Sequence, residues 1–423
     1  MLEVLTVSFF VLILLRVPVA AAMGFSGALA LLTSDLDIPL AVVPQRIFVM
    51  LDSTSLLAIP FFILAGAIME QGGMARRMIT LAEALVGHWR GGLAQIDVLA
   101  SAIFSSLTGS SAASATATGS VMIPAMKRAG YPAGYAAALE ASSAAIGPII
   151  PPSIIMVVYG SLASVSVGAL FLAGIVPGII ITIGLFIVNA VMARRYGWGG
   201  NERASWSQKL VAARHAIAAV LAPFIIIGGI LGGVFTPTEA GAVAVVYAAA
   251  ISLGLYREIG IAQLLRIVVD AALTTGIIGL IIAAAGVFGW VLALEQVPQA
   301  VVAWVQSMTA SPLIAILLVV AIVLLIGCIV DVTAAVIILV PVLAPLGASY
   351  GFDPVHFGVI LCVALVYGNV TPPVGLLLFI TASIARCPVT DVMRHLLPFY
   401  LVLGVALMLT ILFPDLVLFF ARL

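Results

Sequence analysis

Charged side chains are scarce in this sequence. Only 8% of its 423 residues are charged, against about 25% in a typical soluble domain. The formal net charge is zero, and nothing in the sequence predicts a nucleic-acid partner. Only two lysines occur, Lys127 and Lys209, and neither follows a glycine. A Walker-A phosphate loop is therefore absent, which excludes an ATP-driven pump of that type.

Residues that commonly hold metals or act as nucleophiles are also rare. The three cysteines sit in or beside apolar runs without CxxC spacing, and the four histidines lie far apart at the ends of such runs. No Gly-x-Ser-x-Gly or HExxH motif occurs. We therefore expect the cysteines to act as small apolar residues, and we expect no cofactor and no enzymatic activity. The residues are Cys328, Cys362 and Cys387, and His88, His215, His356 and His395.

Apolar residues take up most of the chain. They make up 64% of the sequence, and the mean hydropathy is +1.32. Apolar runs of 20 residues or more recur from end to end, which predicts an all-α polytopic membrane protein. The first run lacks the layout of a signal peptide and is kept as a span. The predicted spans cover residues 4–32, 47–70, 133–160, 165–193, 216–235, 238–256, 267–295, 356–384 and 396–421.

The glycines and prolines that interrupt these runs occur twice. A shift of 221 positions carries Pro124, Gly130, Gly147, Pro151-Pro152 and Pro177 onto Pro345, Gly351, Gly368, Pro372-Pro373 and Pro398. The same shift sets Asp331 opposite Ser110. Matching interruptions in two halves indicate an inverted repeat, the usual construction of a secondary transporter. We assign residues 1–214 to the first repeat and 215–423 to the second, which has an extra span at 216–235.

Two stretches fit a hairpin better than a single span. Residues 311–346 hold two apolar runs separated by a polar segment that begins at Gly327. As one helix they would reach about 54 Å and each half only about 21 Å, against a hydrocarbon core of about 30 Å. A re-entrant hairpin with its tip at mid-membrane resolves both mismatches. Residues 93–126 follow the same pattern, and prolines break the spans 133–160 and 356–384.

Basic residues predict how the chain is oriented. They flank the first hairpin and crowd the loop 194–214, whereas no Lys or Arg occurs between Arg266 and Arg386. Because basic residues favour the cytoplasmic side, the first hairpin and the N-terminus should lie inside and the second hairpin outside. The segment 74–90 alternates apolar and charged positions, which predicts an arm helix in contact with lipid at the membrane interface. Its counterpart is 297–308.

The first hairpin tip is rich in hydroxyl groups. They occur at positions 108, 110, 111, 114, 116 and 118, which exceeds what close helix packing requires. Hydroxyls, free carbonyls and a helix N-terminus suit a carboxylate and its coupling cation. The predicted substrate ligands are Thr108, Ser110, Ser111, Ser114, Asp331 and Thr333.

The broken spans offer carbonyl oxygens. Three prolines between Gly147 and Ser153 remove backbone donors, and the mirror segment begins at Gly368. Free carbonyls at membrane depth are good Na⁺ ligands, although a plain kink would also explain the prolines. The predicted Na⁺ ligands are Ser110, Ser111, Gly147, Pro148, Ser153, Gly327, Asp331, Gly368, Asn369 and Thr371.

Asp331 is the one acid at a predicted hairpin tip. An ionisable group at this depth indicates a functional site, and the alternative is a cap for the helix that follows. The two roles are compatible. Glu140 is also intramembrane, but its repeat partner is Leu361, so symmetry does not support it as a site residue. Glu239, at a helix start after Pro237, is read as structural.

Six motifs in order resemble the large membrane (M) subunit of tripartite ATP-independent periplasmic (TRAP) transporters. They are Phe61–Gly66, the Thr-Gly-Ser-Ser-Ala tip, Gly147–Ser153, Phe235–Gly241, Gly351–Gly358 and Thr371–Gly375. The resemblance implies a Na⁺-coupled elevator transporter in a bacterial or archaeal inner membrane. Its substrate would be a dicarboxylate, sialic acid or similar carboxylate. A small four-helix membrane (Q) subunit and a periplasmic substrate-binding (P) protein would be its partners.

The resemblance also divides the predicted ligands between two Na⁺ sites. Ser110, Ser111, Gly147 and Ser153 match one, and Asp331, Gly368 and Thr371 lie near the other. The main alternative is a stand-alone ion-coupled carboxylate carrier with the same hairpins, which would need no binding protein. An intramembrane enzyme would need a second acid or a nucleophile–base pair at the depth of Asp331, and the sequence shows neither. A scaffold subunit without transport would not need duplicated polar tips.

Overall fold

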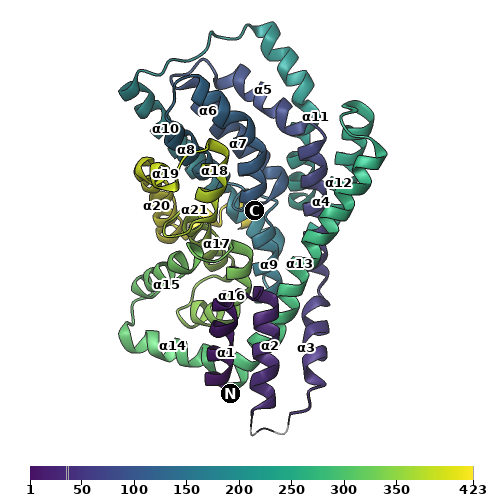
Figure 1. Cartoon of the computed structure of the whole chain (residues 1–423), viewed down its shortest axis with the longest axis vertical. Helices are drawn as coiled ribbons and strands as arrows, with labels where there is room; N and C mark the ends of the chain where they lie inside the picture. Colours follow the sequence, from purple (N-terminus) through teal and green to yellow (C-terminus); the bar gives the residue numbers. More distant parts are fainter. Residues whose placement is uncertain (35, 37, 423) are drawn as a thin grey trace.

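The structure is a computed structural model that describes residues 1–34, 36 and 38–422 (Figure 1). The described residues form helices and connections, with no β-strand among them. The N-terminal part holds α1 (Leu2–Leu14), α2 (Val19–Leu32), α3 (Val42–Leu51), α4 (Ala58–Gln71) and α5 (Met74–Val86).

The prediction of one span over residues 4–32 was wrong. The segment forms two helices, α1 and α2, which lie side by side (Figure 1). Arg16 adopts a left-handed φ of 63°, and Pro18 is the N-cap of α2. A proline disfavours helical geometry in the residue before it and lacks the N–H of a continuous helix. The chain therefore turns where the sequence reads Arg-Val-Pro.

Two helical hairpins lie in different halves of the molecule. The first consists of α6 (Gly92–Thr108) and α7 (Ser111–Arg128), and the second of α15 (Pro312–Gly327) and α16 (Val332–Ser349). The second arms, α7 and α16, begin and end 221 positions apart. Figure 1 shows the first hairpin in the upper half and the second in the lower half, with their tips near the middle.

Each hairpin is followed by a broken helix. The first broken helix is α8 (Ala133–Ala144) and α9 (Ile154–Ala163), and the second is α17 (Pro354–Gly368) and α18 (Leu376–Ala385). A cis Pro–Pro peptide bond lies in each break, at Pro151-Pro152 and Pro372-Pro373. The first halves of both broken helices are almost wholly buried. Helices α8 and α17 therefore lie in the packed interior, whereas α15 of the second hairpin keeps large apolar side chains exposed.

The remaining helices surround this interior. Across the described residues six helices, α4 and the hairpin arm α16 among them, are long and apolar enough to cross a membrane, or seven if α18 and α19, bent by 108°, count as one span. These surrounding helices are α10 (Val167–Tyr196), α11 (Trp206–Leu231), α12 (Pro237–Ala250, continued by a π turn at Ile251–Leu255), α13 (Ile261–Leu294), α14 (Val297–Met308), α19 (Val389–His395), α20 (Leu397–Leu412) and α21 (Pro414–Val417).

The contacts between surrounding helices also follow the repeat. The 221-residue shift carries α2 onto α12 and α4 onto part of α13. The contact of α12 with α4 is therefore the counterpart of the contact of α2 with α13. The short helices α5 and α14 lie at opposite ends of the long axis (Figure 1). The connection between α10 and α11 lies at the α5 end, where the Gly91 N–H donates to the Trp198 carbonyl at 3.3 Å. The basic segments of the sequence therefore gather at the end of the molecule opposite α14. The chain is an all-α polytopic membrane protein with an inverted repeat.

Candidate functional site

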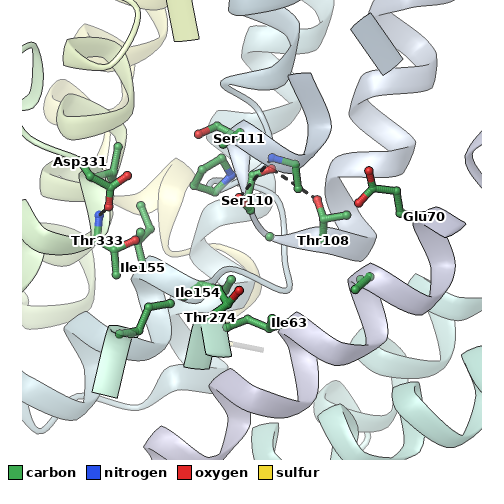
Figure 2. Close-up of a pocket in the computed structure, with 18 residues that line it drawn as sticks. Ile63, Glu70, Thr108, Ser110, Ser111, Ile154, Ile155, Thr274, Asp331 and Thr333 are labelled. Carbon is green, nitrogen blue, oxygen red and sulfur yellow. Dashed lines mark hydrogen bonds between the residues drawn. The ribbon is translucent and has the colours of Figure 1, made fainter. Parts of the chain in front are cut away.

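A cavity of about 250 Å³ lies where the two hairpin tips meet (Figure 2). Its walls come from both tips, from the break between α8 and α9, and from α4 and α13. The lining residues are Ile63, Gly66, Ala67, Glu70, Thr108, Gly109, Ser110, Ser111, Ala112, Ala113, Pro148, Ile154, Ile155, Thr274, Ile278, Asp331, Val332 and Thr333. The 221-residue repeat thus places its two polar tips on one cavity.

The first tip supplies three hydroxyls to this cavity. Thr108, Ser110 and Ser111, all predicted substrate ligands, line it. The fourth, Ser114, is fully buried behind them, and its Oγ lies 3.2 Å from Thr108 Oγ1. The Ser110 hydroxyl accepts from the Ala113 N–H at 3.4 Å and caps α7. Hydrogen bonds within the first turn of α7 and back to Thr108 therefore fix the positions of these hydroxyls.

The second tip supplies Asp331 and Thr333. The Asp331 Oδ1 accepts from the backbone N–H groups of Thr333 at 2.9 Å and Ala334 at 3.4 Å. Asp331 is therefore the N-cap of α16, as one of the two predicted roles requires. Its side chain is exposed and lines the cavity (Figure 2). Both of these capping hydrogen bonds go to Oδ1, so Oδ2 takes no part in the cap.

Three helices begin at the cavity. They are α7, α9 and α16, and their N-caps are Ser110, Ser153 and Asp331. The Ser153 hydroxyl accepts from the Met156 N–H at 3.3 Å and donates to the Pro148 carbonyl at 2.5 Å. Helix N-termini carry partial positive charge and free N–H groups, so they favour an anion such as a carboxylate.

Each tip lies against the break of its own repeat. A Cβ on Gly147 would lie 3.3 Å from the Ser110 carbonyl oxygen, and a Cβ on Gly368 would lie 2.8 Å from the backbone of Gly327. The Gly375 N–H also donates to the Cys328 carbonyl at 2.8 Å. Only glycine allows backbones to approach so closely. The structure thus brings Gly147 against Ser110 in the first repeat and Gly368 against Gly327 in the second.

Most of the predicted Na⁺ ligands outside the tips sit behind the cavity wall. Pro148 lines the cavity, whereas Gly147, Ser153, Gly327, Gly368, Asn369 and Thr371 do not. The Thr371 hydroxyl donates to the Tyr367 carbonyl at 2.8 Å. Asn369 connects the two groups, because its Nδ2 lies 3.4 Å from Ser111 Oγ. Its Oδ1 is buried without a hydrogen-bond partner among the described residues.

Sequence reasoning missed two polar residues of the cavity, Glu70 on α4 and Thr274 on α13. Glu70 is an acid near the end of an apolar run, a signal that could have found it. Thr274 bonds to the Asp270 carbonyl at 3.0 Å in its own helix, and nothing in the sequence distinguishes it. The lining thus carries two acids, and no Lys, Arg or His is among its described residues.

Comparison with known proteins identifies the family. A profile described as "Tripartite ATP-independent periplasmic transporter, DctM component" matches residues 6–416. The chain belongs to this DctM family. It is 39% identical to the C4-dicarboxylate TRAP transporter large permease protein of Pseudomonas aeruginosa, over 93% of this chain and 92% of the relative. It is 37% identical to the 2,3-diketo-L-gulonate TRAP transporter large permease protein of Escherichia coli, over 96% and 95%.

The fold has a solved counterpart. The crystal structure of the Alcanivorax borkumensis YdaH transporter matches with a TM-score of 0.63 at 16% identity, covering 97% of this chain and 98% of that one. Similarity at this level concerns the fold alone. The family profile and the sequence relatives show that the chain is the large permease subunit of a TRAP transporter, a polytopic membrane protein. Membership of this family implies a small membrane subunit and a periplasmic binding protein as partners.

Proposed function

We propose that this permease imports an organic acid together with Na⁺, across the inner membrane of a bacterium or archaeon. The single observation that carries the proposal is the cavity at which three helix N-termini and both hairpin tips meet. A carboxylate fits there because backbone N–H groups and hydroxyls provide its hydrogen-bond donors. Thr108, Ser110, Ser111 and Thr333 would hold the substrate.

The charges of the cavity favour a coupling cation. Glu70 and Asp331 are acids, and no basic side chain lines the described walls. A carboxylate in this place would be repelled unless cations entered with it. Hydroxyl, carbonyl and carboxylate oxygens are hard ligands that suit Na⁺. Substrate and Na⁺ would thus bind together, each supplying charge that the other needs.

The two predicted Na⁺ sites belong to the two tip-and-break groups. Ser110, Ser111, Gly147, Pro148 and Ser153 would form the first. Gly327, Asp331, Gly368, Asn369 and Thr371 would form the second, with Asp331 Oδ2 as the one charged ligand. The contact between Asn369 and Ser111 supports communication between the two sites.

An elevator motion agrees with where the walls come from. The hairpins and broken helices would move as one body, and α4 and α13 would belong to the static scaffold. Their boundary is close, since a Cβ on Gly66 of α4 would lie 3.1 Å from Thr108 Cα in the first tip. Because Gly66 has no side chain, α4 would not obstruct movement of the first tip at this point.

The substrate is set only as a class. Relatives of nearly equal identity are named for a C4-dicarboxylate and for 2,3-diketo-L-gulonate, and both are carboxylates. We propose that the periplasmic binding protein selects among such acids, while the permease recognises the carboxylate. Thermal shifts of that binding protein across a panel of organic acids would identify the substrate.

Reconstitution tests the proposal. Proteoliposomes containing the permease and its small subunit, with the loaded binding protein outside, should accumulate the acid when external Na⁺ is present. Uptake should need no ATP and should stop when K⁺ replaces Na⁺. Uptake driven by a proton gradient without Na⁺ would contradict the assigned coupling ion, and uptake without the binding protein would indicate a stand-alone carrier.

A further inference from the structure

A second polar cluster lies inside the packed interior, between α6, α7 and α8. Its members, Asp97, Ser101, Thr118, Glu140 and Ser143, are all fully buried, and none of them lines the cavity described above. The Asp97 and Glu140 carboxyls interact with one another. The equivalent positions of the second repeat hold Leu318, Ile322, Leu339, Leu361 and Ala364. The repeat fold itself therefore does not require this cluster.

The hydroxyl of Thr118 links Glu140 to helix α7. Its Oγ1 is 2.6 Å from the Ser114 carbonyl, 2.5 Å from Glu140 Oε1 and 3.2 Å from Ser101 Oγ. A hydroxyl has one proton to donate, and a carbonyl can only accept. The one Thr118 proton can therefore satisfy either the Ser114 carbonyl or Glu140 Oε1, but not both. With the proton on Glu140, Glu140 donates to Thr118 Oγ1, Thr118 donates to the Ser114 carbonyl, and both short contacts are hydrogen bonds.

Beside the other oxygens of the pair, the Ser143 hydroxyl is the one neutral donor in the described part of the chain that acts on Asp97. Both Asp97 oxygens, Glu140 Oε2 and Ser143 Oγ are buried and have no hydrogen-bond partner among the described residues. Two ionised carboxylates only accept hydrogen bonds, and the single Ser143 hydroxyl could satisfy one of their oxygens, so as anions they would leave the others unsatisfied. A proton on at least one carboxyl turns an acceptor into a donor. It also removes the repulsion between two buried negative charges.

No basic group compensates for the pair. Tyr135 on α8 is the other titratable group that interacts with Asp97, and its hydroxyl donates to Asn189 Oδ1 at 2.7 Å. No charged side chain of the surrounding helices is among the groups that act on Asp97 or Glu140. The charged or titratable side chains on the neighbouring helices that do not act on the pair are Glu70 on α4, Glu83 on α5, Lys127 and Arg128 on α7, Arg194 and Arg195 on α10, and Asp391, Arg394 and His395 on α19.

The helices α7 and α8 pack closely beside the pair, since a Cβ on Gly119 of α7 would come within 3.0 Å of Glu140 Cγ. Among the described residues no group of three or more His, Cys, Asp or Glu side chains could hold a metal ion. We propose that Asp97 and Glu140 form a proton-binding site that keeps at least one proton, on Glu140, at neutral pH.

The site is connected to the cavity through the first hairpin. Thr118 donates to the Ser114 carbonyl, and Ser114 Oγ contacts Thr108 Oγ1, which lies in the cavity wall. Loss of the proton would leave two anions between α6 and α8 and would push the hairpin away from the broken helix. The site thereby makes the hairpin's packing sensitive to alkaline pH. This inference requires neither Na⁺ coupling nor a particular substrate.

Infrared spectroscopy of the purified permease tests the site without any transport assay. The wild type should show the C=O stretching band of a protonated carboxyl at neutral pH, shifted in D₂O. Glu140→Gln should remove that band. Asp353→Asn, which changes an N-cap carboxylate that accepts backbone bonds from Val355 and His356, should leave it in place.

Two spectroscopic results would overturn the proposal. One is a wild type without a protonated-carboxyl band at neutral pH, or a band that Glu140→Gln does not change. The other is a band that disappears when Na⁺ is added, because it would replace the proton site by a cation site.

The pH dependence of unfolding gives a second readout. The folded chain keeps a proton that an unfolded carboxyl releases above about pH 4. The wild-type melting temperature should therefore fall as pH rises from about 4 to the pH at which the folded pair releases its proton. The double variant Asp97→Asn/Glu140→Gln has nothing to titrate and should lose that part of the slope. An unchanged slope in the double variant would count against the site.

Discussion

Asp331 would combine two roles in one side chain. As an N-cap it orders the start of α16 through Oδ1, and in the proposed Na⁺ site its Oδ2 would bind the cation from the cavity wall. Asparagine caps helices about as well as aspartate does. A substitution by asparagine therefore separates the structural role from the electrostatic one.

We predict that Asp331→Asn folds and assembles normally but binds Na⁺ weakly. Losing an interaction with a charged group of at least about 1.5 kcal/mol should raise the Na⁺ concentration for half-maximal uptake about tenfold or more. Na⁺ titration of uptake in proteoliposomes measures this. Asp353→Asn is the matched control, because Asp353 caps α17 with the same geometry outside the cavity. Wild-type Na⁺ dependence in Asp331→Asn would reduce Asp331 to a helix cap.

At the scale of elements, the hairpins and broken helices could be predicted from sequence. Glycines and prolines interrupt apolar runs whose lengths suit neither one span nor two, so the tips near Ser110 and Asp331 follow from length and turn chemistry. The turn at Arg16 was missed because a proline within an apolar run can also be accommodated inside a membrane helix.

Contacts between segments that are distant along the chain could not be predicted from the sequence in this way. Glu70 faces the first tip only because α4 packs beside it. Glu140 was set aside because its repeat partner is apolar, yet its interaction with Asp97 lies within the first repeat and needs no symmetry. Such pairings depend on how helices pack, which periodicity along one segment does not reveal.

The contact between the second tip and its break gives an element-scale prediction. In Gly368→Ala, the new Cβ would meet the Gly327 backbone at 2.8 Å and push the tip away from the break. Overpacking of this kind costs about 1–3 kcal/mol. We expect a lower melting temperature and a smaller stabilisation by Na⁺ in thermal unfolding of the purified permease.

Gly276→Ala provides the comparison for that substitution. Gly276 lies in α13, where a Cβ would meet nothing within 4 Å. This variant should unfold like the wild type and respond to Na⁺ in the same way. Equal behaviour of the two variants would contradict the proposed second Na⁺ site, which requires close contact between tip and break.

For the whole molecule, the inverted repeat makes a prediction about sidedness. Arg128 ends α7 and Ser349 ends α16, at equivalent positions of the two hairpins. After replacement of the three native cysteines, Ser349→Cys should react with an impermeant thiol reagent from outside and Arg128→Cys only from the cytoplasm. Labelling of intact cells and of inverted vesicles measures this. Reaction of both from the same side would rule out opposite orientation of the hairpins.

The central claim is that carboxylate and Na⁺ share one cavity and move together. Coupling between two ligands is reciprocal, so each must be able to drive the other. The decisive measurement is ²²Na⁺ entry into proteoliposomes that hold the permease and its small subunit, at equal Na⁺ concentration on both sides. Adding the substrate-loaded binding protein outside should drive ²²Na⁺ inward together with the acid. Entry of the acid without any movement of ²²Na⁺ would contradict the account.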